Sequence, residues 1–282
     1  MIPNNSLISS ENNTNNASIP NVSEMNSEQN LIQTLDKETM EILKEVRAKI
    51  LRRIDEVDDV FNRTIEDLVK FREHLMSLAE KYNNVSDNIK AFAEAIERII
   101  DYTNKVKQWY KDKVYGEITK LVKDEYGEIR RRRSGLTIVG QYVTITANKI
   151  NGKIIVMLTI KGIGGINTNV PPLISELIRR SIQVGLMNTD GSIDKKSNHP
   201  RMNTVYLWQI ILWLLAFPGK NYLIISRINI NKKDVKLMWS LISLDYKFKE
   251  KPKLELTFHN VLITYFTAVL GDGYIVLQKK TK

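Results

Sequence analysis

Apolar residues recur every three or four positions between residues 36 and 133, the spacing that places them along one side of an α-helix. The series runs from Leu43 to Tyr110, and charged residues fill the flanking positions as they do in coiled coils. One stutter falls near Val46–Ile54. We therefore predict a long helical, coiled-coil region over residues 36–133.

A run of poor helix formers, Asn83–Asp87, interrupts this region. Two arrangements fit the interruption. The chain turns there and folds two helices into an antiparallel hairpin, or the helix continues and two chains pair in parallel, so that the protein self-associates. Either arrangement predicts a role in assembly or spacing.

The pattern changes to a period of two residues after residue 134. Residues 141–150 and 153–160 are rich in β-branched residues and flank Asn151-Gly152, a strong signal for a two-residue type I′ hairpin. A glycine-rich loop follows and ends at Pro171-Pro172. We predict a β-hairpin and linker over residues 134–171.

Helical and strand-like patterns alternate from residue 172 to the end of the chain. The order is helix, two strands, helix, strand, helix, which predicts an α+β domain over residues 172–282. The expected segments are a helix from Pro172 to Asp190, strands at Ser192–Ser197 and Tyr222–Ile230, a strand merging into a helix over 203–217, an amphipathic helix at Lys233–Leu244, and a strand at Lys253–Phe258.

Two apolar helix patterns in this domain each end in Asp-Gly, at Asp190-Gly191 and Asp272-Gly273. Small residues such as Gly185 and Thr267 precede both, and small residues let two helices approach closely. A carboxylate at a helix C-terminus is unfavourable, and two that meet there require a proton or a cation, with Mg²⁺ the natural choice. Alternatively, each Asp-Gly is an ordinary helix stop with glycine in the left-handed conformation.

The paired motifs, LIRRSIQVGLMNTDGSID and VLITYFTAVLGDGYI, resemble those of the LAGLIDADG homing endonucleases over residues 173–282. In that family two such helices form the interface between two αββαββα halves. The resemblance implies that Asp190 and Asp272 are catalytic, metal-binding acids that hold Mg²⁺ for phosphodiester hydrolysis. Lys195 and Lys196 are further candidates, for neutralising the transition state.

The chain departs from this family in its second repeat, since ten residues follow Asp272 and the fourth strand of the first half is not evident. The expected fold is therefore a helical hairpin or coiled coil, a β-hairpin, and one LAGLIDADG-like half with an incomplete second repeat. Dimerisation through the coiled coil would restore a second half, or the chain is a degenerate, inactive copy.

Charge adds to this interpretation. The first 35 residues, rich in Asn and Ser and predicted to be disordered, contain three glutamates and no lysine or arginine, so the formal charge of +10 rises to +13 over the remainder. A basic body favours DNA as the partner, although a lysine-rich soluble protein would share this composition. The DNA-contact candidates are Arg130, Arg131, Arg132, Arg133, Arg201, Arg227, Lys232, Lys233, Lys247 and Lys249. Tyr246 and Phe248 interleave with the last two, an arrangement that suits base stacking.

Other classes are excluded or disfavoured. The chain has no cysteine, which rules out disulfides, zinc–cysteine sites and thiol nucleophiles, and its three histidines are scattered. The N-terminus lacks the features of a signal peptide, and the longest apolar run is too short to span a bilayer. We expect a cytoplasmic protein with no membrane partner. The expected function is that of a DNA-binding protein resembling a Mg²⁺-dependent endonuclease, and the alternative is a non-enzymatic coiled-coil scaffold or DNA-associated structural protein.

Overall fold

The computed structural model describes residues 36–123, 128–253 and 258–272, with the side chains of the last helix described for residues 261–269. The predicted disordered tail, residues 1–35, lies outside this range. Among the described residues, no helix is both long enough and apolar enough to cross a membrane.

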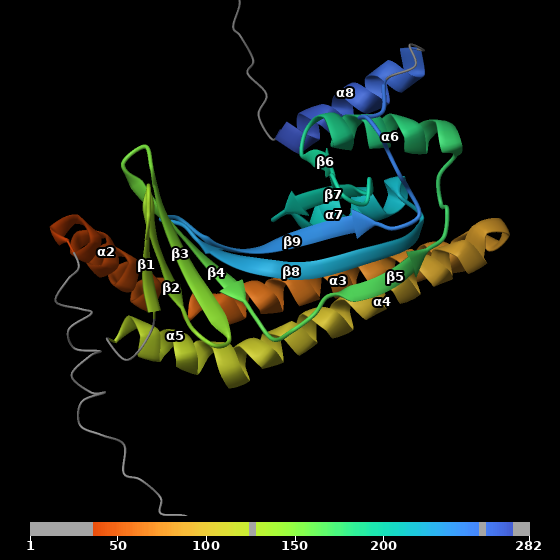
Figure 1. Cartoon of the computed structure of the whole chain (residues 1–282). Helices are drawn as coiled ribbons and strands as arrows, with labels where there is room; N and C mark the ends of the chain where they lie inside the picture. Colours follow the sequence, from red (N-terminus) through yellow and green to blue (C-terminus); the bar gives the residue numbers. More distant parts are fainter. Residues whose placement is uncertain (1–35, 124–127, 254–257, 273–282) are drawn as a thin grey trace, which may run out of the picture.

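The N-terminal region is helical up to residue 122. It comprises α2 (Lys37–Arg53), α3 (Glu56–Lys81), α4 (Ser86–Trp109), a π-helical turn, η2 (Tyr110–Val114), and α5 (Tyr115–Val122). The 3-10 turn η1 (Asn83–Val85) joins α3 to α4, and these two helices pack against each other along their length (Figure 1). The hairpin alternative is therefore confirmed, and the apolar stripe of each helix is buried within one chain.

Nine strands form one antiparallel sheet. They are β1 (Glu128–Arg132), β2 (Gly135–Val139), β3 (Val143–Ile150), β4 (Lys153–Ile160), β5 (Ile166–Val170), β6 (Gly191–Ile193), β7 (Pro200–Thr204), β8 (Gly219–Ile230) and β9 (Val235–Ser243). The spatial order is β1-β2-β3-β4-β8-β9-β7-β6, and β5 pairs with the same edge of β8 as β4 does. The predicted type I′ hairpin joins β3 to β4, with φ values of 49° at Asn151 and 72° at Gly152. The sheet runs without interruption across the predicted boundary at residue 171.

Both the N-terminal helices and α7 (Leu207–Ala216) cover the same face of this sheet. Tyr102 of α4 packs its ring 6.1 Å from that of Trp239 in β9. Thr204, the partner of Trp239 in β7, donates a hydrogen bond from its hydroxyl to the side chain of Gln209 in α7. Residues that point to this face are buried along β4, β8 and β9, whereas their neighbours on the other face are half-buried or exposed.

Two further helices complete the C-terminal part, α6 (Glu176–Asn188) and α8 (Phe258–Asp272), so that its order is α6-β6-β7-α7-β8-β9-α8. They run in the same direction. The Thr264 hydroxyl donates to the carbonyl of Ser181 at 3.1 Å, and one turn further along, Gly185 lies against Thr267. Figure 1 shows α8 lying along α6 beyond the β6 edge of the sheet.

Three expectations are wrong. The helix predicted at Lys233–Leu244 is strand β9, the fourth strand that the sequence did not reveal. Its apolar residues fit both a helical and a two-residue period, and pairing with β8 and β7 selects the strand. The linker before Pro171 contains β5, which pairs with β8.

The third wrong expectation is the end of the helical region predicted over residues 36–133, because residues 128–132 form strand β1. A run of charged residues suits a strand at the edge of a sheet, where charges prevent association with other chains. The remaining differences are smaller. The first strand of the C-terminal part is β6 rather than Ser192–Ser197, and of the strand expected at Lys253–Phe258, residues 254–257 lie outside the described ranges and Phe258 begins α8.

Candidate nucleic-acid interface and acidic helix end

Asp190 lies at the end of α6, exposed and next to the first residue of β6. Its Oδ2 accepts a hydrogen bond of 2.6 Å from the side-chain amide of Gln209. Gln209 comes from α7 and is only 2% exposed, and its amide oxygen accepts the hydroxyl proton of Thr204. The carboxylate is thus held by a buried relay of polar side chains that links α6, α7 and β7.

Gly191 allows the chain to turn directly from α6 into the sheet. A Cβ at this position would lie 2.7 Å from the Cα of Met187, closer than side chains approach. Asp190 and Gly191 therefore combine a closely packed turn with a carboxylate held by a hydrogen bond. Gly191 is not in the left-handed conformation that an ordinary glycine helix stop would have.

The parallel packing of α6 and α8 determines where the second motif lies. Ser181 lies beside Thr264, and Gly185 lies beside Thr267. Counting five residues onward from Gly185 and from Thr267 reaches residue 190 and Asp272, which therefore lie at about the same level along the helix pair. The side chain of Asp272 lies outside the described residues. The backbone brings the two predicted acidic positions to the same end of the helix pair.

Lys195 and Lys196 lie elsewhere, at the tip of the β6–β7 hairpin, and both are exposed. Asp194 organises this tip, because its Oδ1 accepts hydrogen bonds from the amides of Lys196 and Ser197 and from the Ser197 hydroxyl. The Ser197 bonds, followed by that from Lys196, lower the pKa of Asp194. Strand β6 lies between Asp190 and this tip, so the carboxylate and the two lysines are at opposite ends of the strand.

The sheet face opposite the helices is polar and cationic. Strand pairing and alternation of burial place the following residues on it, mostly Thr, Asn, Ser, Arg and Lys. They are Glu128, Arg130, Arg132, Thr137, Val139, Thr144, Thr146, Asn148, Ile150, Lys153, Ile155, Met157, Thr159, Asn167, Asn169, Ser192, Arg201, Asn203, Lys220, Tyr222, Ile224, Arg227, Asn229, Lys236, Met238, Ser240 and Ile242. Two of them, Thr137 and Thr146, are buried, and the others are half-buried or exposed. We call this set the open face.

The four consecutive arginines divide between the two faces. Arg130 and Arg132 belong to the open face, since they pair with Thr137 and Gly135 of β2. Arg131 points to the helix side, where its guanidinium donates to Glu38 at 2.8 Å and to Thr39 at 2.9 Å. Arg133 is exposed in the turn that follows β1.

Arg201 and Arg227 lie on the open face at the opposite end of the sheet and at its middle. Some of the cations on the open face form ion pairs with acidic residues. Arg201 lies 3.6 Å from Asp194, Lys236 lies 3.1 Å from Asp234, and Arg130 lies 2.6 Å from Glu128. All three pairs are more than a quarter exposed at each partner, so solvent weakens them and leaves the cations able to contact phosphates.

Lys232 and Lys233 form the turn between β8 and β9 and are exposed. Their backbone carbonyls accept hydrogen bonds of 2.6 Å and 2.9 Å from Arg53 of the α2 end, which fixes the turn. Their ammonium groups therefore extend from a rigid corner of the sheet.

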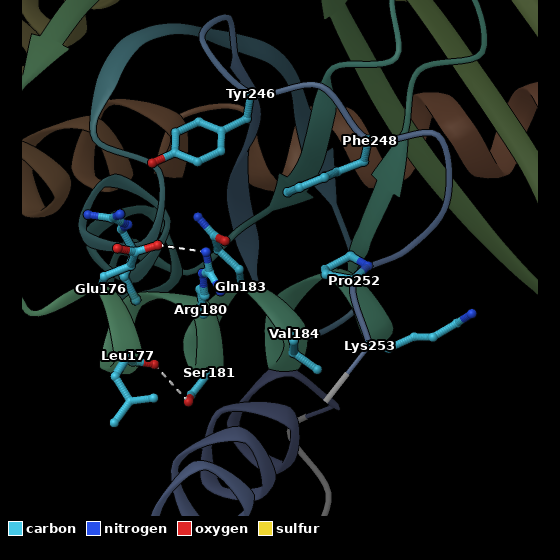
Figure 2. A pocket seen from close by; sticks show the side chains of 11 residues that line it. Glu176, Leu177, Arg180, Ser181, Gln183, Val184, Tyr246, Phe248, Pro252 and Lys253 are labelled. Atoms are coloured by element: carbon cyan, nitrogen blue, oxygen red, sulfur yellow. Dashed lines mark hydrogen bonds and ion pairs between the residues drawn. The ribbon is translucent and has the colours of Figure 1, made fainter. Parts of the chain in front are cut away.

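Lys247 and Lys249 are exposed in the segment after β9, but the aromatic residues between them turn inward. Tyr246 and Phe248 pack 5.3 Å and 6.3 Å from Phe217. Figure 2 shows both rings on one wall of a cavity of about 720 Å³ beside α6, opposite Arg180 and Gln183. Both rings are half-buried and pack against Phe217, so only part of each ring remains exposed for the base stacking that their spacing suggested.

Within the described ranges, no group of three or more His, Asp or Glu side chains could hold a metal ion by itself. The chain gives no significant match to protein-family models, to curated proteins or to solved structures.

Proposed function

We propose that this chain binds duplex DNA on the open face of its sheet, and that it is a relative of the LAGLIDADG endonucleases. The observation that carries the proposal is the division of the sheet into two chemically different faces. One is apolar and covered by helices, and the other presents arginines at intervals among short polar side chains.

Such a surface suits DNA for two reasons. Guanidinium groups neutralise phosphates and pair with guanine edges, while Asn, Thr and Ser bond to base edges and phosphates. The sheet is also wide enough. The distance from β1 to β7 spans six strand intervals, or roughly 29 Å at ~4.8 Å each, which is close to one turn of B-DNA.

The relationship to the endonuclease family is supported by element order and by helix pairing. The C-terminal part follows the order αββαββα, and its first and last helices run in the same direction with their C-terminal ends, near residues 190 and 272, on the same side. The N-terminal helices and β1–β4 are additions to that unit, and they extend its sheet.

A magnesium ion fits the chemistry at this end. Mg²⁺ is commonly held by one or two carboxylates, with water and substrate phosphates as the other ligands. Asp190, exposed and oriented by Gln209, would supply one carboxylate, and Asp272 is the candidate for the second. When bound, the ion would supply Lewis-acid stabilisation of the phosphodiester oxygens. The contribution of the chain is to fix the orientation of Asp190 and to hold DNA against it.

The second candidate function is non-enzymatic DNA binding. The side chain of Asp272 lies outside the described residues, and no group of three or more acidic or histidine side chains that could hold a metal ion is found among the described ones. A DNA-associated structural protein would retain the open face and use the Asp-Gly turns for packing alone.

Two assays test these functions. Gel-shift titration of duplex DNA is compared between the wild-type protein, Arg227→Gln and Arg98→Gln, whose arginine is exposed on the helix side of the molecule. We expect Arg227→Gln to weaken binding several-fold and Arg98→Gln to leave it unchanged. Supercoiled plasmid is then incubated with Mg²⁺ and the wild-type protein, Asp190→Asn, or Asp87→Asn as an exposed control.

Nicking that is lost in Asp190→Asn and kept in Asp87→Asn supports the nuclease. Binding without nicking supports the structural alternative. Absence of binding at low salt contradicts both functions.

A further inference from the structure

Tyr206 and Trp208 form an exposed aromatic pair where β7 passes into α7. Tyr206 is 47% exposed and Trp208 is 37% exposed, and their rings are stacked at 26° with centroids 6.1 Å apart. Trp213 and Trp239, by contrast, are buried in the core. Large exposed aromatic surfaces of this kind are typical of binding sites.

The pair lies at the border of the open face. Lys236, an open-face residue of β9, places its ammonium group 5.1 Å from the centroid of the Tyr206 ring. The hydrogen bond from Lys236 to Asp234 raises the pKa of this lysine, so it stays protonated beside the ring. The ammonium group of Lys236 and the stacked rings of Tyr206 and Trp208 therefore lie together at the edge of the open face, where duplex DNA is proposed to bind.

A cavity of about 520 Å³ adjoins Tyr206, between α3 and the start of β9. Cations and acids both line it. Among them Glu56 is paired with Arg53 at 2.8 Å, and Arg63, Thr64 and Asp67 offer donors and acceptors. This mixture of charges would not favour a phosphate, whereas it suits the edge of an uncharged planar ring.

We propose that Tyr206 and Trp208 form a stacking platform for an unpaired nucleobase of a DNA strand that lies on the open face. A paired base inside a duplex offers no free ring face, so the platform distinguishes DNA that has an unpaired base from fully paired DNA. The inference rests on the proposed DNA-binding function and adds a preference for a single-stranded overhang or an extruded base.

The test compares a blunt duplex with the same duplex carrying a single-stranded overhang. Stacking of one base changes binding by roughly tenfold, so we expect the wild-type protein to prefer the overhang by about that factor. Tyr206→Ala and Trp208→Ala should lose this preference while retaining affinity for the blunt duplex. Tyr82→Ala is the matched control, because Tyr82 is 46% exposed with Lys81 over its ring but lies at the far tip of the helical hairpin.

A second measurement uses the intrinsic fluorescence of Trp208 with a short single-stranded oligothymidylate as the probe. Quenching by the oligonucleotide should be lost in Trp208→Phe, a change that retains a planar ring and the fold. Equal affinity of the wild-type protein for blunt and overhanging duplexes, or full preference in Tyr206→Ala, overturns the inference. If blunt duplex does not bind but the oligonucleotide still quenches Trp208, the platform stands and binding on the open face fails.

Discussion

At the scale of single residues, the relay from Thr204 through Gln209 to Asp190 is the most constrained polar arrangement near the acidic helix end. Gln209 is a buried amide whose donor and acceptor are both used by side chains from other elements. Leaving a buried partner unsatisfied costs about 1–3 kcal/mol, so this residue couples the orientation of Asp190 to the stability of the fold.

Replacing Gln209 by leucine should lower the melting temperature by several degrees, at roughly 2–4 °C per kcal/mol for a chain of this size. Gln209→Glu should instead show pH dependence, because its carboxyl would face Asp190. The neighbouring charge would raise the pKa of the new glutamate above its value in the unfolded chain. This variant should therefore be closer to wild type near pH 4 and lose stability as the pH rises. Chemical denaturation at pH 4, 5.5 and 7 measures this, and a Gln209→Glu variant that is insensitive to pH would contradict the geometry.

Residue patterns predicted part of this site. Asp190 was predicted from its position after an apolar helix and before a glycine. Gln209 was missed, because a single polar residue within an apolar run does not reveal which neighbour it will contact. The exposed pair Tyr206 and Trp208 belongs to the same run, and only the tertiary structure separates these rings from buried Trp213.

At the scale of elements, α6 and α8 approach each other closely at Gly185. A Cβ on Gly185 would lie 2.7 Å from the Cβ of Thr267 and 2.9 Å from the carbonyl oxygen of Thr264. The helices approach so closely because the residues between them are small. The separation of the two helices, and hence the relative position of their C-terminal ends, depends on this glycine.

Gly185→Ala should destabilise the protein by about 1–3 kcal/mol through overpacking. Gly116→Ala is the control. Gly116 also lies in a helix, but nothing is within 4 Å of a Cβ built there, so alanine should stabilise by ~0.5–1 kcal/mol. Urea unfolding of both variants measures the contrast, and equal effects would show that α6 and α8 do not pack as described.

The contact of α4 with the sheet predicts a response to alkaline pH. Burial raises the pKa of Tyr102 to about 12 from the ordinary value of 10.0, although its hydroxyl accepts a hydrogen bond from the amide of Ile225. The folded state thus retains a proton that the unfolded state releases above pH 10. The stability contributed by this residue is present below pH 10 and is lost between pH 10 and pH 12, at up to ~1.4 kcal/mol per pH unit.

Tyr102→Phe should therefore unfold with a shallower dependence on pH above 10, while Tyr82→Phe, at an exposed tyrosine, should match the wild type. Guanidinium denaturation at pH 9, 10 and 11 gives the slopes. Burial also raises the pKa of Tyr110, so part of the dependence should persist in Tyr102→Phe.

At the scale of the whole molecule, the N-terminal helices and α7 cover one face of a single sheet, and the opposite face is mostly half-buried or exposed. Sequence periodicity predicted the helical region, with a hairpin as one of its two possible arrangements, and also the β3–β4 hairpin and the α+β class. It could not predict that β4 and β5 join the same edge of β8, since such pairings link residues far apart in the chain. Strand β9 was mistaken for a helix because its apolar positions satisfy both periods.

This arrangement predicts the dependence of DNA binding on salt. In the proposed DNA complex, each phosphate contact on the open face should contribute about one unit to the slope of log affinity against log salt concentration. Arg132→Gln and Arg227→Gln should each reduce that slope by about one, whereas Arg98→Gln should leave it unchanged. Fluorescence anisotropy with labelled duplex over a range of salt concentrations measures the slopes. An unaltered slope in both open-face variants would place the DNA elsewhere on the protein.

Strand β8 is bordered on one side by β9 along nearly its whole length, and on the other side by β5 at its start and β4 at its end. It therefore joins β1–β4 and β5 to the strands β9, β7 and β6 within the sheet. We therefore expect the backbone amides of β8 to exchange with deuterium only through global unfolding of the protein. The N-terminal helices and the C-terminal unit should consequently melt as a single cooperative body, and neither is expected to survive excision from the other.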